Sequence, residues 1–159
     1  ICNKSILSLI IVIKGVNIKD ITSHADDRGF FREIWRFQEN AEIRDLRKGE
    51  GQISHSLVNK GVIKAWHGHT EQGQLNYVVS GAIRMALIDN RKDSRSFQEF
   101  LELKIFSEKP QVYYFPPGVL HGYECIDGPM HIIYMTSGIY DLEDEVRVAP
   151  EELESIFKW

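Results

Sequence analysis

Short runs of β-branched and aromatic residues, each closed by glycine, proline or asparagine, follow one another from Gly51 to residue 137. Such runs at regular spacing are typical of an all-β sandwich or jelly-roll barrel. A barrel of this kind offers a mouth lined by inward side chains, where ligands bind preferentially. We therefore expect strands at 51–59, 61–66, 74–80, 82–89, 97–105, 111–115, 119–126 and 130–137, with turns at 59–61, 80–81, 116–118 and 127–129.

The rest of the chain adds few elements. We expect strands over 6–13 and 30–37, one internal helix over 39–48, and a short C-terminal helix over 150–159 with Pro150 in its first turn. Residues 1–159 are expected to form a single domain, which buries roughly 70% of its unfolded surface. Residues 1–20 carry an apolar strand whose open edge favours exchange with a second subunit.

Charge and cysteine content narrow the classes of partner. A net charge of −4 and a pI near 5.9 give no electrostatic reason to expect nucleic acid or an anionic membrane as a partner. The apolar run 6–13 is too short to span a bilayer, and no small-residue cleavage site follows it. Cys2 and Cys125 do not make a disulfide framework, which favours reduced thiols in the cytoplasm.

Three histidines from two distant segments predict one shared pocket. His67 and His69 are two residues apart in a predicted strand, so both side chains face the same way. His121 follows the turn Pro116-Pro117-Gly118, which sets the start of its own strand. A lone histidine is usually a satisfied core group, but three with matched facing favour a functional site.

One interpretation of this cluster is a metal site. His67, His69, Gln74 and His121 have the ligand types and spacing to hold a divalent iron, nickel or zinc ion, as in a dioxygenase or a metal-dependent isomerase. These four side chains bring no negative charge, so such a site is weaker than one that includes a glutamate.

A second interpretation comes from motifs that match a known family in order and separation. The chain resembles the cupin group of dTDP-4-dehydrorhamnose 3,5-epimerases from about residue 20 to residue 140. Gln74 and Cys125 stand where the general cupin motifs usually have glutamate and asparagine. The matching pieces are DDRGFFRE (26–33), QISHS (52–56), GVIKAWH (61–67), IDNRKDSRSFQEF (88–100), YFPPGVLHGY (114–123) and IIYMTSGIY (132–140).

The resemblance implies a double-stranded β-helix barrel, a homodimer, and chemistry that needs no cofactor. Members of the family invert carbons C3 and C5 of a nucleotide-linked 4-keto-6-deoxyhexose, for the deoxysugars of surface polysaccharides. His67 matches the family's base, which removes the proton beside the ketone. Tyr134 matches the acid that returns a proton to the opposite face.

Further positions match residues that bind the substrate in the family. Some of these contacts come from the partner subunit in family members. Lys64 stands where the family has a phosphate-binding arginine, and Tyr140 matches an aromatic residue near the nucleotide base. The substrate-binding residues implied by the resemblance are Arg28, Phe31, Glu33, Gln52, Lys64, His69, Gln74, His121 and Tyr140.

The chain also departs from the family pattern. Gln74 replaces a lysine that would steady the enolate oxygen, Met85 replaces an aspartate, and His69 replaces a glutamine. The C-terminal region that supplies an aspartate to orient the base is shortened, and 141–145 is interpreted as a solvated acidic loop. These departures support two further hypotheses: epimerisation at C3 or C5 alone, or a nucleotide-sugar-binding cupin without catalysis.

Overall fold

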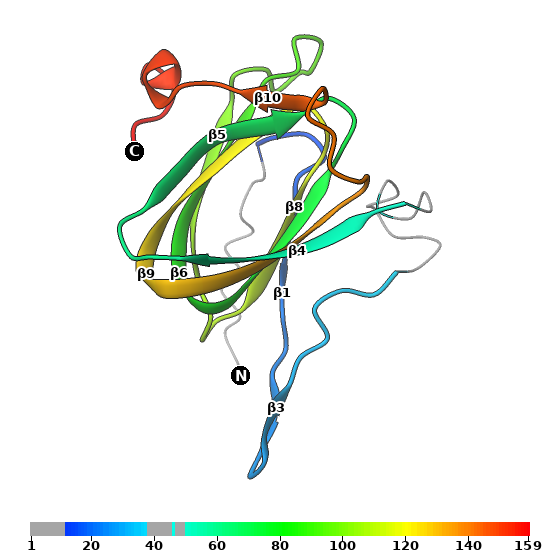
Figure 1. Cartoon of the computed structure of the whole chain (residues 1–159), viewed down its shortest axis with the longest axis vertical. Helices are drawn as coiled ribbons and strands as arrows, with labels where there is room; N and C mark the ends of the chain where they lie inside the picture. The colour runs from blue at the N-terminus through cyan, green and yellow to red at the C-terminus, as the bar shows by residue number, and fades with distance from the viewer. Residues whose placement is uncertain (1–11, 38–45, 47–49) are drawn as a thin grey trace, which may run out of the picture.

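A computed structural model describes residues 12–37, 46 and 50–159, and nearly all of its regular structure is β-strand (Figure 1). A short 3₁₀ helix, η2 (Pro150–Leu153), lies near the C-terminus. The strands are β1 (Asn17–Asp20), β2 (His24–Asp26), β3 (Gly29–Phe31), β4 (Gln52–Val58), β5 (Ile63–His69), β6 (Gln74–Asp89), β7 (Phe100–Phe106), β8 (Gln111–Phe115), β9 (Val119–Thr136) and β10 (Glu145–Arg147).

Two long antiparallel strands, β6 and β9, each contribute to both faces of the barrel. The first half of β6 and the last half of β9 belong to one face of the barrel with β1, β8 and β4. Their other halves belong to the opposite face with β7, β5 and β10. Figure 1 shows these strands curving to form a barrel. The predicted all-β double-stranded β-helix is therefore confirmed.

The turns predicted at 80–81 and 127–129 are wrong as strand ends, because both segments are bends inside continuous strands. The register of β6 against β9 shifts between Val78 and Ile83, where the two bends meet. Gly81 has φ +82°, and a Cβ atom there would lie 2.5 Å from the carbonyl oxygen of Asp127. Only glycine combines this backbone conformation with so close an approach. The turn residues thus correctly predicted where the chain changes direction, but these positions are bends within strands and not strand ends.

The core fills the barrel below its mouth. Buried apolar side chains of β6, among them Ile83, Met85 and Leu87, pack with Phe115 and Ile132. Met85, which stands where the family has an aspartate, is fully buried in this cluster. That position therefore contributes to packing in this protein and not to the cavity.

The C-terminal segment is helical only over Pro150–Leu153, shorter than the predicted helix over 150–159. Beyond it, the rings of Phe157 and Trp159 pack on the buried ring of Trp66, at centroid distances of 5.7 Å and 5.0 Å. Burial of these aromatic rings, and not helix propensity, therefore determines the conformation of the last residues.

The N-terminal third differs most from expectation. β1 pairs with β8 of its own chain. Residues 1–11, which belong to the predicted exchanged segment, lie outside the described residues. The same is true of nearly all of the predicted helix over 39–48. In place of the predicted strand over 30–37, only Gly29–Phe31 forms a strand. It pairs with His24–Asp26 in a hairpin that projects from the barrel (Figure 1). Exchange between subunits stays a prediction.

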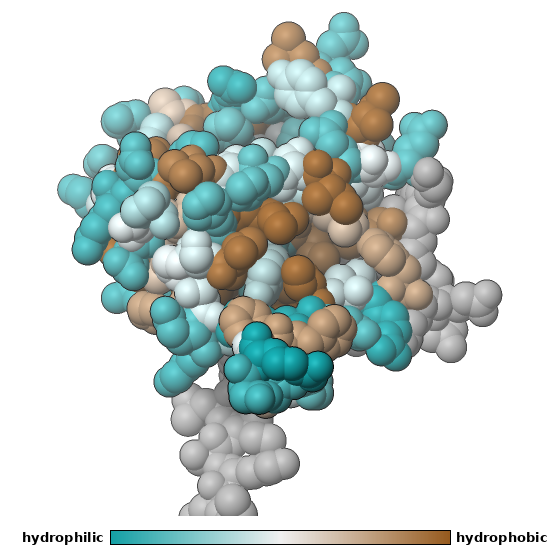
Figure 2. Space-filling view, turned by 60° about the horizontal axis from the view of Figure 1, so that its bottom comes forward, coloured by the Kyte–Doolittle hydropathy of each residue, from teal (hydrophilic) through white to brown (hydrophobic). Residues whose placement is uncertain are grey.

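Within the described residues, no helix is long and apolar enough to cross a membrane. Figure 2, which brings the lower end of Figure 1 forward, shows apolar side chains gathered on that face of the molecule. Exposed apolar side chains of β4 and the hairpin include Ile53, Leu57, Phe30 and Phe31.

Candidate active site

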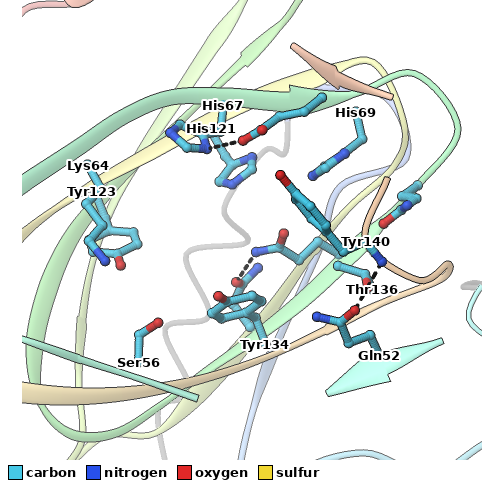
Figure 3. Close-up of a pocket in the computed structure, with 14 residues that line it drawn as sticks. Gln52, Ser56, Lys64, His67, His69, His121, Tyr123, Tyr134, Thr136 and Tyr140 are labelled. Carbon is cyan, nitrogen blue, oxygen red and sulfur yellow. Dashed lines mark hydrogen bonds and ion pairs between the residues drawn. The ribbon is translucent and has the colours of Figure 1, made fainter. Parts of the chain in front are cut away.

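A cavity of about 270 Å³ opens at the barrel mouth, between the upper strands and the loop that follows β9 (Figure 3). Strands β4, β5, β6, β9 and β10 all contribute side chains to it. Its lining residues are Gln52, Ser56, Lys64, His67, His69, Gln72, Gln74, Asn76, His121, Tyr123, Tyr134, Thr136, Tyr140 and Glu145.

Most residues singled out from the sequence meet in this cavity. They are Gln52, Lys64, His67, His69, Gln74, His121, Tyr134 and Tyr140. Three do not: Arg28, Phe31 and Glu33 lie in or beside the projecting hairpin. There Arg28 pairs with Asp26 and is 86% exposed, while Glu33 pairs with Arg36. Their contact with a nucleotide held by a partner subunit stays a prediction.

His67 forms a dyad with Glu145, a residue that sequence reasoning assigned to a solvated loop. That assignment is wrong, since Glu145 begins β10, pairs with β5, and has a side chain only 8% exposed. The Nδ1 atom of His67 lies 3.2 Å from Oε1 of Glu145. The carboxylate therefore keeps the proton on Nδ1 and leaves Nε2 free to accept one.

The charges around this dyad favour a neutral imidazole and an ionised carboxylate. Burial lowers the pKa of His67, and the negative charge of Glu145 only partly offsets that effect. A hydrogen bond from Arg147 lowers the pKa of Glu145, so this carboxylate remains charged at neutral pH. A neutral imidazole with a free Nε2 is the protonation state that a general base requires.

The Glu145→Gln variant should reveal this coupling in a pH profile. Removing the carboxylate takes away a charge that raises the pKa of His67, so the acidic limb of kcat/KM should move to lower pH. We expect kcat to fall roughly 10²-fold, the lower end of what general base catalysis contributes. Turnover of a nucleotide-linked 4-keto sugar measured between pH 4 and 8 tests this. An acidic limb that stays in place would contradict the dyad.

A second histidine–carboxylate pair lies beside the first. Nδ1 of His69 lies 3.3 Å from Oδ2 of Asp144, and both side chains are largely buried. The other oxygen of Asp144 accepts hydrogen bonds from the Thr70 hydroxyl and from the backbone N–H groups of Thr70 and Glu71. Although burial raises the pKa of Asp144, these hydrogen bonds outweigh it and the net pKa is lowered.

His121 forms a neutral wall of the cavity. Its ring stacks on Phe115 at a centroid distance of 4.5 Å and lies 6.1 Å from the ring of His67. Burial, reinforced by the neighbouring histidines, lowers the pKa of His121 to about 3. His121 is therefore uncharged at neutral pH, and it does not compete with His67 for a proton.

Tyr134 faces the histidines from the far side of the cavity (Figure 3). It lies in β9, between Ser54 of β4 and Asn76 of β6 in the strand register. Tyr123, from the other half of β9, lines the same cavity, and burial raises its pKa to about 12. The Tyr134 hydroxyl thus lies on the side opposite the imidazoles, whereas Tyr123 lies beside Lys64 (Figure 3).

Gln74, which stands in place of a lysine, is held by another amide. Its Nε2 atom donates to Oδ1 of Asn76 at 2.6 Å, and both side chains are buried. Among the described residues, the buried atoms without a hydrogen-bond partner include Nδ2 of Asn76, Nδ1 of His121, and the facing atoms Nδ1 of His69 and Oδ2 of Asp144, whose 3.3 Å contact is an ion pair. Unpaired buried polar atoms around a cavity are the expected state of a site that binds a polar ligand.

The loop after β9 is tied to the barrel by side-chain amides. Gln52 accepts a hydrogen bond from the backbone N–H of Tyr140, and Gln72 donates to the carbonyl of Ile139. These contacts place the Tyr140 ring at the cavity opening, where Figure 3 shows it beside His69. An aromatic ring at that position can stack on a planar ligand.

The metal interpretation finds little support in this geometry. Within the part of the chain that the structure describes, no group of three or more His, Cys, Asp or Glu side chains is arranged to hold a metal ion. His67 and His69 each pair with a carboxylate through Nδ1, so only the Nε2 atom of either ring is left to face the cavity.

Several residues of the site were missed in the sequence. Asp144 and Glu145 were missed because the acidic run 141–145 carries no periodicity that distinguishes a strand from a loop. The only indication of these two residues in the sequence was that His67 and His69, as functional histidines, would need carboxylate partners, and no carboxylate had been assigned to them. The other missed residues are Ser56, Gln72, Asn76, Tyr123 and Thr136.

Fold and cavity together define a class: a cupin barrel whose mouth carries acid–base side chains. The sequence model for dTDP-4-dehydrorhamnose 3,5-epimerase matches residues 11–159. The chain therefore belongs to the dTDP-4-dehydrorhamnose 3,5-epimerase family.

Individual relatives support this assignment. The spore coat polysaccharide biosynthesis protein SpsL of Bacillus subtilis is 36% identical over 151 residues, which are 93% of this chain and 97% of SpsL. The probable low-salt glycan biosynthesis epimerase Agl13 of Haloferax volcanii is 30% identical over 135 residues, 83% of each chain. The crystal structure of RmlC from Legionella pneumophila, in complex with dTDP-4-keto-L-rhamnose, has the same fold, with a TM-score of 0.83 at 23% identity over 92% of this chain and 79% of that one.

Proposed function

We propose that this protein is an isomerase that epimerises a nucleotide-activated 4-keto-6-deoxyhexose at C3, C5 or both, in the biosynthesis of a surface polysaccharide. One observation carries the proposal: the neutral base His67, oriented by Glu145, lies across the cavity from Tyr134. A base on one face of a sugar ring and an acid on the other are what inversion of a carbon requires.

The reaction proceeds through an enolate. Nε2 of His67 takes the proton from the carbon beside the C4 ketone, and the C–H electron pair forms a carbon–carbon double bond. The C4 carbonyl π pair moves onto oxygen. When the enolate collapses, the new C–H bond takes its proton from the Tyr134 hydroxyl on the opposite face. Solvent then returns a proton to the phenolate and accepts one from the imidazolium.

The other lining residues bind the substrate in this proposal. Lys64 offers a positive charge for the diphosphate, and Tyr140 an aromatic face for the nucleotide base. Gln52, His69, Gln74 and His121 surround the sugar. No bound cofactor enters the proposal, because the ketone of the substrate acidifies the adjacent C–H bond.

Incubation in deuterated water tests the activity. The substrate is 4-keto-6-deoxyglucose linked in turn to thymidine, cytidine or guanosine diphosphate. We expect deuterium at C3, C5 or both, together with an inverted product resolved by NMR. Nucleotide binding without any exchange would instead support the non-catalytic binding cupin. Deuterium retained at both carbons in the product would rule out action at a single carbon.

The assembly and location of the enzyme are part of this proposal. A homodimer is supported by the exposed apolar side chains of β4 and the hairpin, Ile53, Leu57, Phe30 and Phe31. Arg28, Phe31 and Glu33 then complete the nucleotide site of the partner subunit. Reduced thiols, including buried Cys125, fit a cytoplasmic enzyme.

A further inference from the structure

The proposed epimerisation creates a negative charge on the C4 oxygen of the substrate, and that charge needs a stabilising group. Donors aimed at a developing oxyanion supply the largest single part of many enzymes' rate enhancement. Gln74 is an unfavourable candidate, because its amide is neutral and its Nε2 donates to Asn76. Lys64, which also lines the cavity, is assigned above to the diphosphate, so the C4 oxygen needs another donor.

We infer that His69, held by Asp144, is this donor: a protonated imidazole whose Nε2–H binds the C4 oxygen and stabilises the enolate. The inference rests on the proposed function. His69 follows His67 by two residues in β5, so both rings face the same cavity, as Figure 3 shows. Along a strand, two residues span roughly 6.6 Å. One ring can therefore reach the C–H bond while the other reaches the neighbouring oxygen.

Asp144 makes a charged His69 favourable. Its Oδ2 atom lies 3.3 Å from Nδ1 of His69, while its Oδ1 is anchored by three donors of the loop after β5. Because Nδ1 faces Asp144, Nε2 is the nitrogen left for the cavity. A hydrogen bond from a charged donor is roughly twice as strong as one between neutral groups.

The His67–Glu145 and His69–Asp144 pairs therefore differ in their surroundings, and we assign them different roles in the reaction. The charged and titratable groups around His69 are Asp144 just before β10, Glu145 on β10, His67 on β5, His121 on β9 and Tyr140 of the loop after β9. Both carboxylates favour the imidazolium, whereas a positive charge on either neighbouring histidine would oppose it. His121 is neutral, and His67 enters the reaction neutral, so His69 can hold the cluster's single positive charge.

Substitutions at His69 test the inference through graded rates. The His69→Leu variant, which has no donor, should lower kcat for deuterium exchange about 10²–10³-fold, the effect of losing one oxyanion donor. KM should change much less, because the interaction strengthens only as the enolate forms. His69→Gln keeps a neutral donor and should fall between His69→Leu and the native enzyme. Adding Gln74→Lys to His69→Leu should restore part of the rate by returning a cation to the cavity.

Asp144→Asn probes Asp144 as a positioning residue. The asparagine oxygen can still accept the three hydrogen bonds of the loop, while an amide NH2 replaces the carboxylate oxygen that faces Nδ1 of His69, so both the charge and the acceptor at that position are lost. The kcat for deuterium exchange should then fall while KM changes much less, because the interaction strengthens only as the enolate forms. Thr70→Val is the matched control: it removes one donor to Asp144 but keeps the carboxylate, and should change the melting temperature without a comparable loss of kcat.

The outcomes separate this inference from the proposed function. Exchange in His69→Leu within a few-fold of the native rate, while His67→Asn is inactive, would overturn the role of His69 alone. Loss of exchange at only one of the two carbons would also overturn it, because that pattern identifies a second base. A native enzyme that exchanges no deuterium would overturn the proposed function itself.

Discussion

The His67→Asn variant is expected to lose deuterium exchange by about 10²–10⁴-fold, the contribution of a well-placed general base. Asparagine is of similar size and can still donate to Glu145, so the cavity should keep its shape. It offers no nitrogen basic enough to accept the proton from carbon. Loss of exchange should therefore accompany nearly unchanged nucleotide affinity, measured by calorimetry with the nucleoside diphosphate.

A control variant keeps this result interpretable. Ser107→Ala lies in the loop after β7, outside the cavity lining, and should exchange deuterium at the native rate. Exchange in His67→Asn close to the native rate would exclude His67 as the base. A matching loss of nucleotide affinity would show that the substitution had disturbed binding as well as chemistry.

Removing the Tyr134 hydroxyl should separate the two halves of the reaction. The Tyr134→Phe variant retains His67 and Glu145, so the first proton can still leave the substrate. It has no acid on the far face, and formation of inverted product should fall roughly 10²-fold or more. Deuterium should then enter the recovered substrate faster than product accumulates, which a time course by NMR and mass spectrometry measures.

The comparison between exchange and product decides the role of Tyr134. Equal losses of both would leave the hydroxyl without an acid role and indicate that it binds substrate in both steps. Tyr123→Phe provides a comparison within the same cavity, since burial raises the pKa of Tyr123 to about 12 and this phenol keeps its proton. A larger loss of product in Tyr123→Phe than in Tyr134→Phe would transfer the acid role to Tyr123.

Residues whose position follows from local periodicity could be predicted from the sequence. His67 and His69 share a face because alternation in a strand is a local property, and the turn at 116–118 fixes the start of the strand with His121. Family motifs added Tyr134, Tyr140 and the barrel itself. These assignments needed no knowledge of long-range packing.

The remaining features depend on contacts between distant segments, which periodicity does not encode. The acidic run 141–145 ends in a turn and the first residue of β10, and its last two carboxylates are buried only because β5 offers an open edge opposite β10. The last residues leave the helical path because Trp66 provides a buried aromatic surface for Phe157 and Trp159. Asn76 is an exception: it follows the predicted site residue Gln74 by two positions in one strand, so the alternation that paired His67 with His69 could have assigned it to the cavity.

The paired bends in β6 and β9 have a consequence for how the proton donor and acceptor are spaced. Strand β9 carries His121, the register partner of His67, before its bend and Tyr134 after it, so a single strand links the two sides of the cavity. The gap across which a sugar ring must fit is therefore set by the curvature of two strands and not by the conformation of a loop. Loops at the mouth can therefore differ in length and sequence, and so determine which nucleotide or sugar binds. The distance between His67 and Tyr134 stays the same.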